Sequence, residues 1–434
     1  MKLREVDKNI TKNKMTNTLR MFRHINKSKF LLLLIVFTFS CSQQEESLFA
    51  ENVPVTPDNN KQYDGVIDYL TDLGTLNINA FANGNYPGKS DPSFIKDINS
   101  PSFAYCHPDV QYFPNGFNGY KYWMVFTPYF GAVGNDQNSK RYENPTIVVS
   151  NDGINWNGPN GPANPLQRAP SVNESFSENK QDPRQGFWSD VDWTFENGKF
   201  SLYYRGSLIK ASALRARGAK SQNNLRKLLK NSQRTIVRQT STDGIYWTPL
   251  EAVYTSNTPY APKNNHIISP SIVYNGKGYV SYEVENNISP NFPGNDPSYI
   301  ITRTSNNGLD FSTFKQSKVV NFINKPWTQV NSEYAPWHIQ ATYVDGYYFL
   351  CIAAGEVKKY TAESLYLAFS KDGLNFKVLP KPLVEHNTYR SSIFPMNTNN
   401  ETIDFGAVIA YKTGIFKYRE FKLNKEKLDA CLSK

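Results

Sequence analysis

Apolar and aromatic residues alternate with polar ones in short runs, and each run ends at a turn signal, so the pattern predicts β-strands rather than helices. Four times such a run is followed by the phrase Ser-x-Asp/Asn-Gly-x-x-Trp/Phe. Asp-Gly and Asn-Gly favour tight hairpins because Gly adopts positive φ without a Cβ clash. The chain is therefore predicted to be a repeat protein, with phrases at 150–156, 241–247, 305–311 and 370–376.

The spacing of the phrase glycines defines the repeat. Gly153 and Gly244 are 91 residues apart, whereas Gly308 and Gly373 follow after 64 and 65 more. A period near 65 residues suits a four-stranded propeller blade with long loops. The first interval therefore contains about 26 residues more than the period requires.

Each phrase is preceded by a second hairpin pattern, in which two aromatic-rich runs flank an Asn-Gly or Asp-Gly turn. The four units thus read strand, turn, strand, loop, strand, turn, strand. The predicted turns are Asn115-Gly116, Asn197-Gly198, Asn275-Gly276 and Asp345-Gly346.

A fifth unit near the C-terminus has only three strand-like runs, at 391–396, 403–411 and 416–423. A closed ring needs a fourth strand, and residues in about 70–104 are the remaining ordered-looking segment that could supply it. We predict an all-β fold, a five-bladed β-propeller closed by this upstream strand. A six-bladed propeller and an open sandwich are the structural alternatives.

The net charge of +10 is concentrated at the N-terminus, since residues 1–40 hold nine Lys or Arg and two acids. That leaves +3 for the rest, which does not favour a nucleic-acid partner. Lys27 and Lys29 precede the apolar stretch 30–39, and Ser40-Cys41 follows. This order predicts a secretory signal that is too short to span a bilayer.

Cys41 at the expected cleavage point resembles the lipidated Cys of a bacterial lipoprotein. We predict a lipoprotein-type signal peptide over 1–41, with Met15 or Met21 as alternative starts, a flexible tether over 42–62 and the propeller over 63–434. The expected location is the bacterial cell envelope, by a lipid anchor on Cys41, or otherwise the secreted fraction.

Cofactor signals are weak in this chain. No Cys spacing is typical of zinc, and the five His are scattered, so we predict no metal centre and no cofactor. A structural Ca²⁺ in the axial channel is compatible with a propeller, but no motif indicates one.

Carboxylates and basic residues gather where the blades should form an axial pocket. In a propeller the inner strands start at one face, and the loops between second and third strands open there too. Converging carboxylates are costly unless function requires them, and glycoside hydrolysis uses such a pair. The structural alternative is that they cap amides or pair with Arg. The catalytic candidates are Asp109, Asp190, Asp192, Glu283 and Glu285, and the substrate-binding candidates are His107, Glu143, Trp188, Arg205, His338 and Arg390.

Residues from about 102 to 425 resemble the five-bladed-propeller glycosidases, including families 43 and 32. The resemblance rests on His-Pro-Asp-Val at 107–110, on Trp-Ser-Asp-Val-Asp at 188–192 and on the repeated hairpin phrases. It implies a propeller fold and hydrolysis of glycosidic bonds.

The resemblance also implies roles for single residues. Asp109 matches the base or nucleophile of that group, and Asp190 or Asp192 matches the carboxylate that tunes a pKa. The acid is a Glu, for which Glu143, Glu283 and Glu285 are the candidates.

The extra residues fall in blade two, between Arg205 and Thr235. Residues 211–230 are rich in helix formers, and residues 199–238 contain eleven Lys or Arg and no acid. A short basic helix beside the pocket would attract anions, although it could equally be a solvated flap.

The predicted function is a secreted or surface-anchored glycoside hydrolase acting on a polysaccharide, either anionic or neutral. The alternatives are a non-catalytic glycan-binding lipoprotein on the same fold and, third, a polysaccharide lyase.

Overall fold

The computed structural model describes residues 65–80, 103–130, 145–159, 164, 166, 187–207, 234–255, 267–286, 297–312, 316–359 and 361–433. All of them belong to one compact unit, residues 43–434. The predicted signal peptide, the tether, Cys41, Glu143 and the helix predicted at 211–230 lie outside the described residues.

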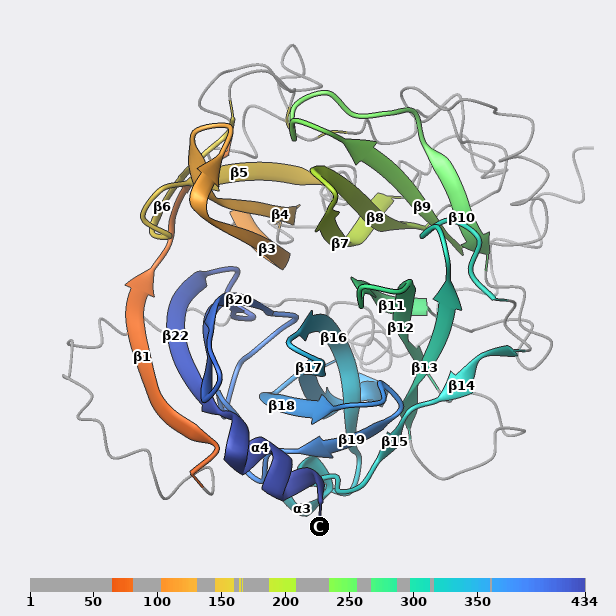
Figure 1. Cartoon of the computed structure of the whole chain (residues 1–434). Coiled ribbons are helices and arrows are strands. Elements are labelled where there is room, and N and C mark those ends of the chain that lie inside the picture. The colour runs from red at the N-terminus through yellow and green to blue at the C-terminus, as the bar shows by residue number, and fades with distance from the viewer. Residues whose placement is uncertain are drawn as a thin grey trace, which may run out of the picture. The chain divides into compact units, whose positions relative to one another are not determined.

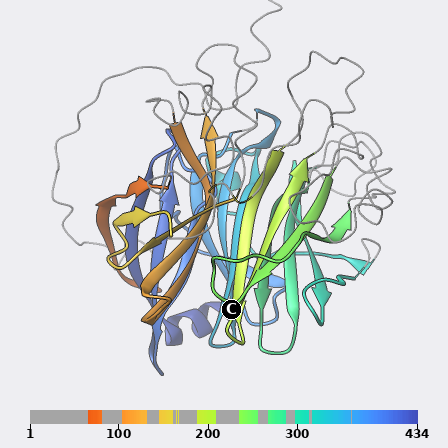
Figure 2. The same cartoon turned by 90° about the horizontal axis from the view of Figure 1, so that it is seen from above.

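Five β-sheets are arranged around a common axis (Figure 1), and their strands run along that axis when seen from the side (Figure 2). The innermost strands contact one another in a closed order. These inner strands, from blade one to blade five, are β3 (Phe103–Phe117), β7 (Phe187–Glu196), β11 (Ile267–Tyr274), β16 (Tyr334–Val344) and β20 (Ser392–Thr398).

Each inner strand pairs antiparallel with the strand that follows it, and that strand pairs with a third. The second strands are β4 (Tyr120–Phe130), β8 (Lys199–Ser207), β12 (Tyr279–Asn286), β17 (Tyr347–Glu356) and β21 (Thr402–Ala410). The third strands are β5 (Thr146–Ser150), β9 (Arg234–Ser241), β13 (Ser298–Ser305), β18 (Ser364–Ser370) and β22 (Phe416–Asn424).

Short strands form the outer edge of each blade. In blades one and four a further strand pairs parallel to the outer one, β2 (Asn77–Asn79) on β6 and β15 (Asn321–Phe322) on β19. The outer strands are β6 (Asn155–Asn157), β10 (Glu251–Thr255), β14 (Lys318–Val319), β19 (Asn375–Val378) and β1 (Ile67–Thr75).

Strand β1 closes the ring. It pairs antiparallel with β22, from Ile67 opposite Leu423 to Thr75 opposite Lys417, and so gives blade five its fourth strand. The predicted five-bladed propeller with an upstream closing strand is confirmed, although β1 begins slightly before the predicted window.

The described helices are short. They are α3 (Trp327–Val330), the 3₁₀ turn η4 (Val357–Lys359) and α4 (Lys425–Leu432). No helix among the described residues has both the length and the apolar character needed to cross a membrane.

One predicted turn is wrong. β3 continues past Asn115-Gly116, and the chain reverses at Asn118-Gly119 instead. Asn118 and Gly119 both have positive φ, 46° and 86°, as the tight two-residue turn requires.

The repeated phrases also join neighbouring blades. In the first phrase Asp152 Oδ1 accepts hydrogen bonds from the backbone of Ile154 and Asn155, which fixes the turn. A Cβ added to Gly244 would lie 2.3 Å from the ring of Trp123 in blade one, so only Gly fits there. The phrase therefore shapes the hairpin, and its Gly leaves room for a side chain of the neighbouring blade.

Candidate functional site

One residue near the start of each of three inner strands has an irregular backbone. His107, Asp190 and Ser269 have positive φ of 56°, 51° and 48°, and each lies at a β-bulge. Positive φ is uncommon for residues other than Gly, and such strain concentrates at functional sites. Because the same strained position recurs in three blades, this end of the inner strands is the candidate functional site.

Equivalent positions of the five blades form two layers around the axis. We call the layer at the bulges the upper layer; the lower layer lies two residues further along each strand. The upper layer consists of His107, Asp190, Ser269, His338 and Arg390. The lower layer consists of Asp109, Asp192, Ser271, Gln340 and Ser392.

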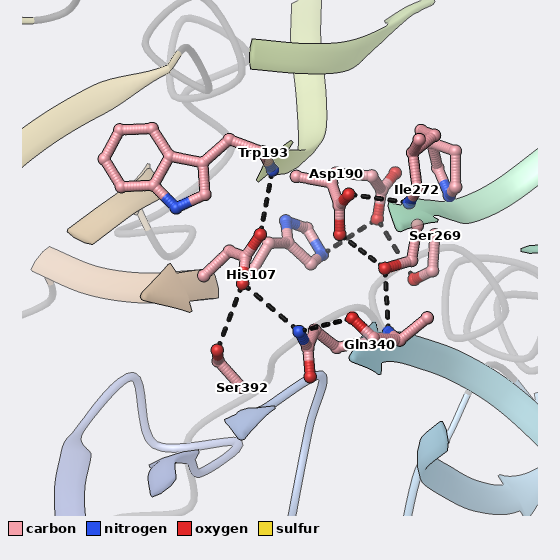
Figure 3. Close-up of polar contacts among 12 residues, drawn as sticks. His107, Asp190, Trp193, Ser269, Ile272, Gln340 and Ser392 are labelled. Atoms are coloured by element: carbon pink, nitrogen blue, oxygen red, sulfur yellow. Dashed lines mark hydrogen bonds and ion pairs between the residues drawn. The ribbon is translucent and has the colours of Figure 1, made fainter. Parts of the chain in front are cut away.

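The lower layer forms a closed ring of hydrogen bonds between blades, and Figure 3 shows part of it, including the bonds of Trp193 and Ile272. Every member accepts a hydrogen bond from a backbone N–H of the next blade, and blade five returns to blade one. The bonds are Trp193 N to Asp109 (2.8 Å), Ile272 N to Asp192 (2.7 Å), Ala341 N to Ser271 (2.8 Å), Ile393 N to Gln340 (3.1 Å) and Val110 N to Ser392 (3.2 Å).

The two carboxylates of the lower layer are further occupied. Asp109 also accepts from Gln340 Nε2 (3.3 Å) and Ser392 Oγ (3.1 Å). Asp192 accepts from Ser271 Oγ (2.5 Å) and from Arg390 (3.1 Å). Both are about 1% exposed.

Burial weakens the acidity of both groups. Burial raises the pKa of Asp109 to about 6, although the Trp193 N–H opposes this. Burial, with the charge of Asp109, raises the pKa of Asp192 well above its usual range. A buried carboxylate pair with its oxygens used by the scaffold is suited to joining blades.

The upper layer has a different chemistry, centred on Asp190. Its Oδ1 lies 3.2 Å from His107 Nε2 and 3.6 Å from His338 Nδ1, and its Oδ2 lies 2.6 Å from Arg205. Burial would raise the pKa of Asp190, but the Arg205 guanidinium and the two His hold it below its usual range. Asp190 is thus a buried anion with its Oδ1 turned toward two imidazoles.

Both imidazoles are held in the neutral form. Burial lowers the pKa of His107 to about 4 and that of His338 well below its usual value. Thr127 Oγ1 lies 3.2 Å from the Cys106 carbonyl oxygen and 2.7 Å from Nδ1 of His107. In the tautomer that carries its proton on Nδ1, His107 donates to Thr127, and the lone pair of Nε2 faces the Asp190 carboxylate, where a cation would bind both.

Aromatic and hydroxyl groups enclose the two imidazoles. The Tyr389 ring lies 4.4 Å from that of His338 and 5.3 Å from that of His107, measured between centroids. Ser269 Oγ bonds His338 Nδ1 and lies 3.5 Å from Asp190 Oδ1 (Figure 3).

The donor set fits a metal ion. Ligand atoms of one tetrahedral ion with bonds of about 2.1 Å lie about 3.4 Å apart, close to the two distances from Asp190 Oδ1. Among the described residues, His107, Asp190 and His338 form a group compact enough to hold one ion. Two His and a carboxylate are typical of catalytic zinc.

This arrangement departs from the prediction that the scattered His form no centre. His107 and His338 are 231 residues apart, yet the repeat brings them to the same height in their blades.

Arg390 of the upper layer reaches across the axis. It begins in blade five and donates to Asp192 in blade two (3.1 Å) and to the Pro270 carbonyl in blade three (3.3 Å), while fully buried.

The predicted glutamates lie on another face. Glu283 of β12 pairs with Arg303 of β13 (2.9 Å). In blade two the equivalent positions are held by Tyr204 and Gln239, which form a hydrogen bond of 2.8 Å. Glu285 lies two residues further along β12, so it shares that face and is fully buried. Neither belongs to the two axial layers.

The predicted Trp188 is also a core residue. It is 1% exposed, and its ring packs edge-on against that of Tyr204 at 5.6 Å.

The sequence analysis missed Ser269, Ser271, Gln340 and Ser392 as site residues. An alignment of the five inner strands would have found them, because each holds the position that a predicted residue holds in another blade.

Comparison with known proteins adds to this geometry. No family model matches the chain. A protein from Flavonifractor plautii named A type blood N-acetyl-alpha-D-galactosamine deacetylase is 25% identical over 347 residues, 71% of this chain and 40% of that protein. The matched region thus spans about two fifths of that relative's length.

Solved structures show the same architecture. The crystal structure of an N-acetylgalactosamine deacetylase from F. plautii with blood group B trisaccharide has a TM-score of 0.53 at 18% identity, covering 75% of this chain and 92% of that chain. A thermostable family-43 glycoside hydrolase has a TM-score of 0.43 at 12% identity, covering 74% and 88%. The first of these likenesses, with a TM-score above 0.5, shows that this chain shares its fold with that structure.

Proposed function

We propose that this protein is a glycan-acting hydrolase that removes the acetyl group from an N-acetylated amino sugar. The observation that carries the proposal is the convergence of His107, Asp190 and His338 at the starts of three inner strands. The similarity to a protein named as an N-acetylgalactosamine deacetylase supports the choice of reaction.

The reaction adds water across an amide. The water oxygen bonds to the acyl carbon, the C–N bond breaks, and the nitrogen leaves as an amine after gaining a proton, with acetate as the second product. A divalent cation held by His107, Asp190 and His338 would polarise the acyl oxygen and lower the pKa of water.

The surrounding residues prepare this site. Arg205 keeps Asp190 ionised through its 2.6 Å contact with Oδ2, which leaves Oδ1 for the cation. Thr127 fixes the proton of His107 on Nδ1 and so frees Nε2 as a ligand. Tyr389 packs against both rings and so helps to fix their orientation.

Glycoside hydrolysis is the second candidate. In its favour, Asp109 and Asp192 are two carboxylates with raised pKa at the axis. Against it, the oxygens of both carboxylates already accept hydrogen bonds that join the blades. The deacetylase proposal therefore stands first.

The test is a product analysis with N-acetylated glycans, including N-acetylgalactosaminides, in the presence of Zn²⁺, Mn²⁺ or Co²⁺. We expect one acetate and one free amine per turnover and no new reducing ends. Reducing ends without acetate would make it a glycosidase, and unsaturated products would make it a lyase. Glycan binding without any product would support a non-catalytic binding protein.

We also propose that the mature protein is anchored by a lipid on Cys41, from the signal-like residues 27–41 alone. The Cys41→Ala protein should lose the lipid from its mature N-terminal peptide in mass spectrometry and leave the membrane fraction. An unchanged membrane fraction would contradict the anchor.

A further inference from the structure

Arg390 carries hydrogen-bond donors that no described residue accepts. Its NH2 group bonds Asp192 and the Pro270 carbonyl, but Nε and NH1 have no hydrogen-bond partner within the described part of the chain, and the residue is 0% exposed. Unsatisfied buried donors on a charged group are costly, and in native proteins they mark a missing water, ion or ligand.

The position of these donors connects them to the candidate site. Arg390 belongs to the same layer as His107, Asp190 and His338, and its charge is close enough to lower the pKa of all three. Its guanidinium reaches the axis, where the starts of the inner strands converge.

A second buried arginine provides a contrast. Arg303 is similarly buried, but it pairs with Glu283 inside blade three, away from both axial layers. Arg390 shares Asp192 with Ser271 and the Ile272 backbone, so its carboxylate partner is already divided among three donors. The remaining positive charge and free donors at Arg390 suit one more acceptor.

We propose that Arg390 forms an oxyanion subsite that binds the acyl oxygen during the reaction and the acetate product afterwards. The identity of the ligand rests on the proposed function, because acetate is what that reaction releases. An acyl oxygen that gains negative charge accepts charge-assisted hydrogen bonds from the NH1 group. Arg390 would then be a catalytic residue rather than only a link between blades.

The test measures acetate binding without turnover, so it remains informative if deacetylation fails. Thermal unfolding is followed in sodium acetate, sodium glucuronate and sodium chloride at equal ionic strength, for wild type, Arg390→Lys and the matched control Arg303→Lys. We expect acetate to raise the Tm of wild type and Arg303→Lys by about 2–4 °C in a saturable way, with no rise for Arg390→Lys.

Two results would overturn the proposal. If Arg390→Lys keeps the acetate effect, the anion is held elsewhere; if wild type shows none, the donors are satisfied by water. Stabilisation by glucuronate alone would assign the arginine to a uronate of the substrate and so reject the acyl subsite.

A wild-type experiment covers the case in which Arg390→Lys does not fold. A crystal soaked in acetate should place a carboxylate oxygen within about 3.2 Å of NH1. A crystal with only water at that position would contradict the proposal.

Discussion

The two axial layers are two residues apart on the same strands, yet they use similar side chains for opposite purposes. In the lower layer every acceptor is matched to a backbone N–H of the next blade, and the five bonds close a ring. In the upper layer Asp190 faces two neutral imidazoles, and Arg390 keeps free donors.

The difference shows that burial and charge alone do not identify a functional carboxylate. Asp109 and Asp190 are both buried and both axial, but burial dominates the pKa of Asp109, whereas at Asp190 the charges of Arg205 and its other neighbours together outweigh burial. What separates them is the partner: a backbone amide in one case, and ligand-type side chains in the other.

The largest expected effect is on activity, from the upper layer. Asp190→Asn should lower kcat/KM by at least about 100-fold and abolish tight binding of Zn²⁺ or Mn²⁺, because the anionic ligand is lost. Activity assays and calorimetric metal titration measure both, with the exposed His386→Ala as the control variant. An Asp190→Asn protein that still binds the ion as wild type does would contradict the role of this layer.

The next effect is on stability, from the lower layer. Asp109→Ala leaves Trp193 N–H and the Ser392 hydroxyl without the carboxylate that accepts from them, and should lower the free energy of unfolding by about 3–5 kcal/mol. Asp109→Asn keeps one acceptor and should cost about 1–2 kcal/mol with activity within a few fold of wild type. Denaturant unfolding measures the stability of both variants, and the amount of acetate released measures their activity. A folded but inactive Asp109→Asn protein would show that Asp109 is a catalytic group.

A smaller change should follow from Ser271→Ala. Its hydroxyl accepts from Ala341 N and donates to Asp192, so its removal breaks one link of the ring. We expect a loss of about 1–3 kcal/mol in unfolding free energy and no change in metal affinity. A loss of metal binding here would mean that the two layers are not separable.

The smallest effect on stability is expected for a carboxylate outside both layers. Asp372 accepts from the backbone of Leu374 and Asn375 in the fourth phrase, and Asn307 holds the equivalent position in the third. Burial would raise the pKa of Asp372, but hydrogen bonds from Asn375 lower it to about 2. Asp372→Asn should therefore cost under about 1 kcal/mol at pH 7, since it is a largely exposed group.

The pH dependence of that variant has a defined sign. A lowered pKa means that Asp372 stabilises the fold above about pH 4, and that this contribution is lost as the pH falls toward 2. The difference in unfolding free energy between wild type and Asp372→Asn should shrink over this range. A difference that grows on acidification would contradict the hydrogen-bond account.

The repeats made the blade count, the strand order and the closure predictable, because the phrase glycines and the hairpin signals are local. The axial side chains were predictable only as a set. Whether Asp109 or Asp190 meets an amide or an imidazole depends on residues more than 80 positions away in another blade. The pairing of Glu283 with Arg303 could not be predicted for a similar reason. The register between strands decides on which face of the sheet a side chain lies.

The most direct test of the division between the layers compares Asp190→Asn with Asp109→Asn on one N-acetylated glycan, with acetate and reducing ends measured in the same samples. We predict acetate from wild type and Asp109→Asn, almost none from Asp190→Asn, and reducing ends from none of them. Reducing ends from wild type that vanish in Asp109→Asn would contradict the account.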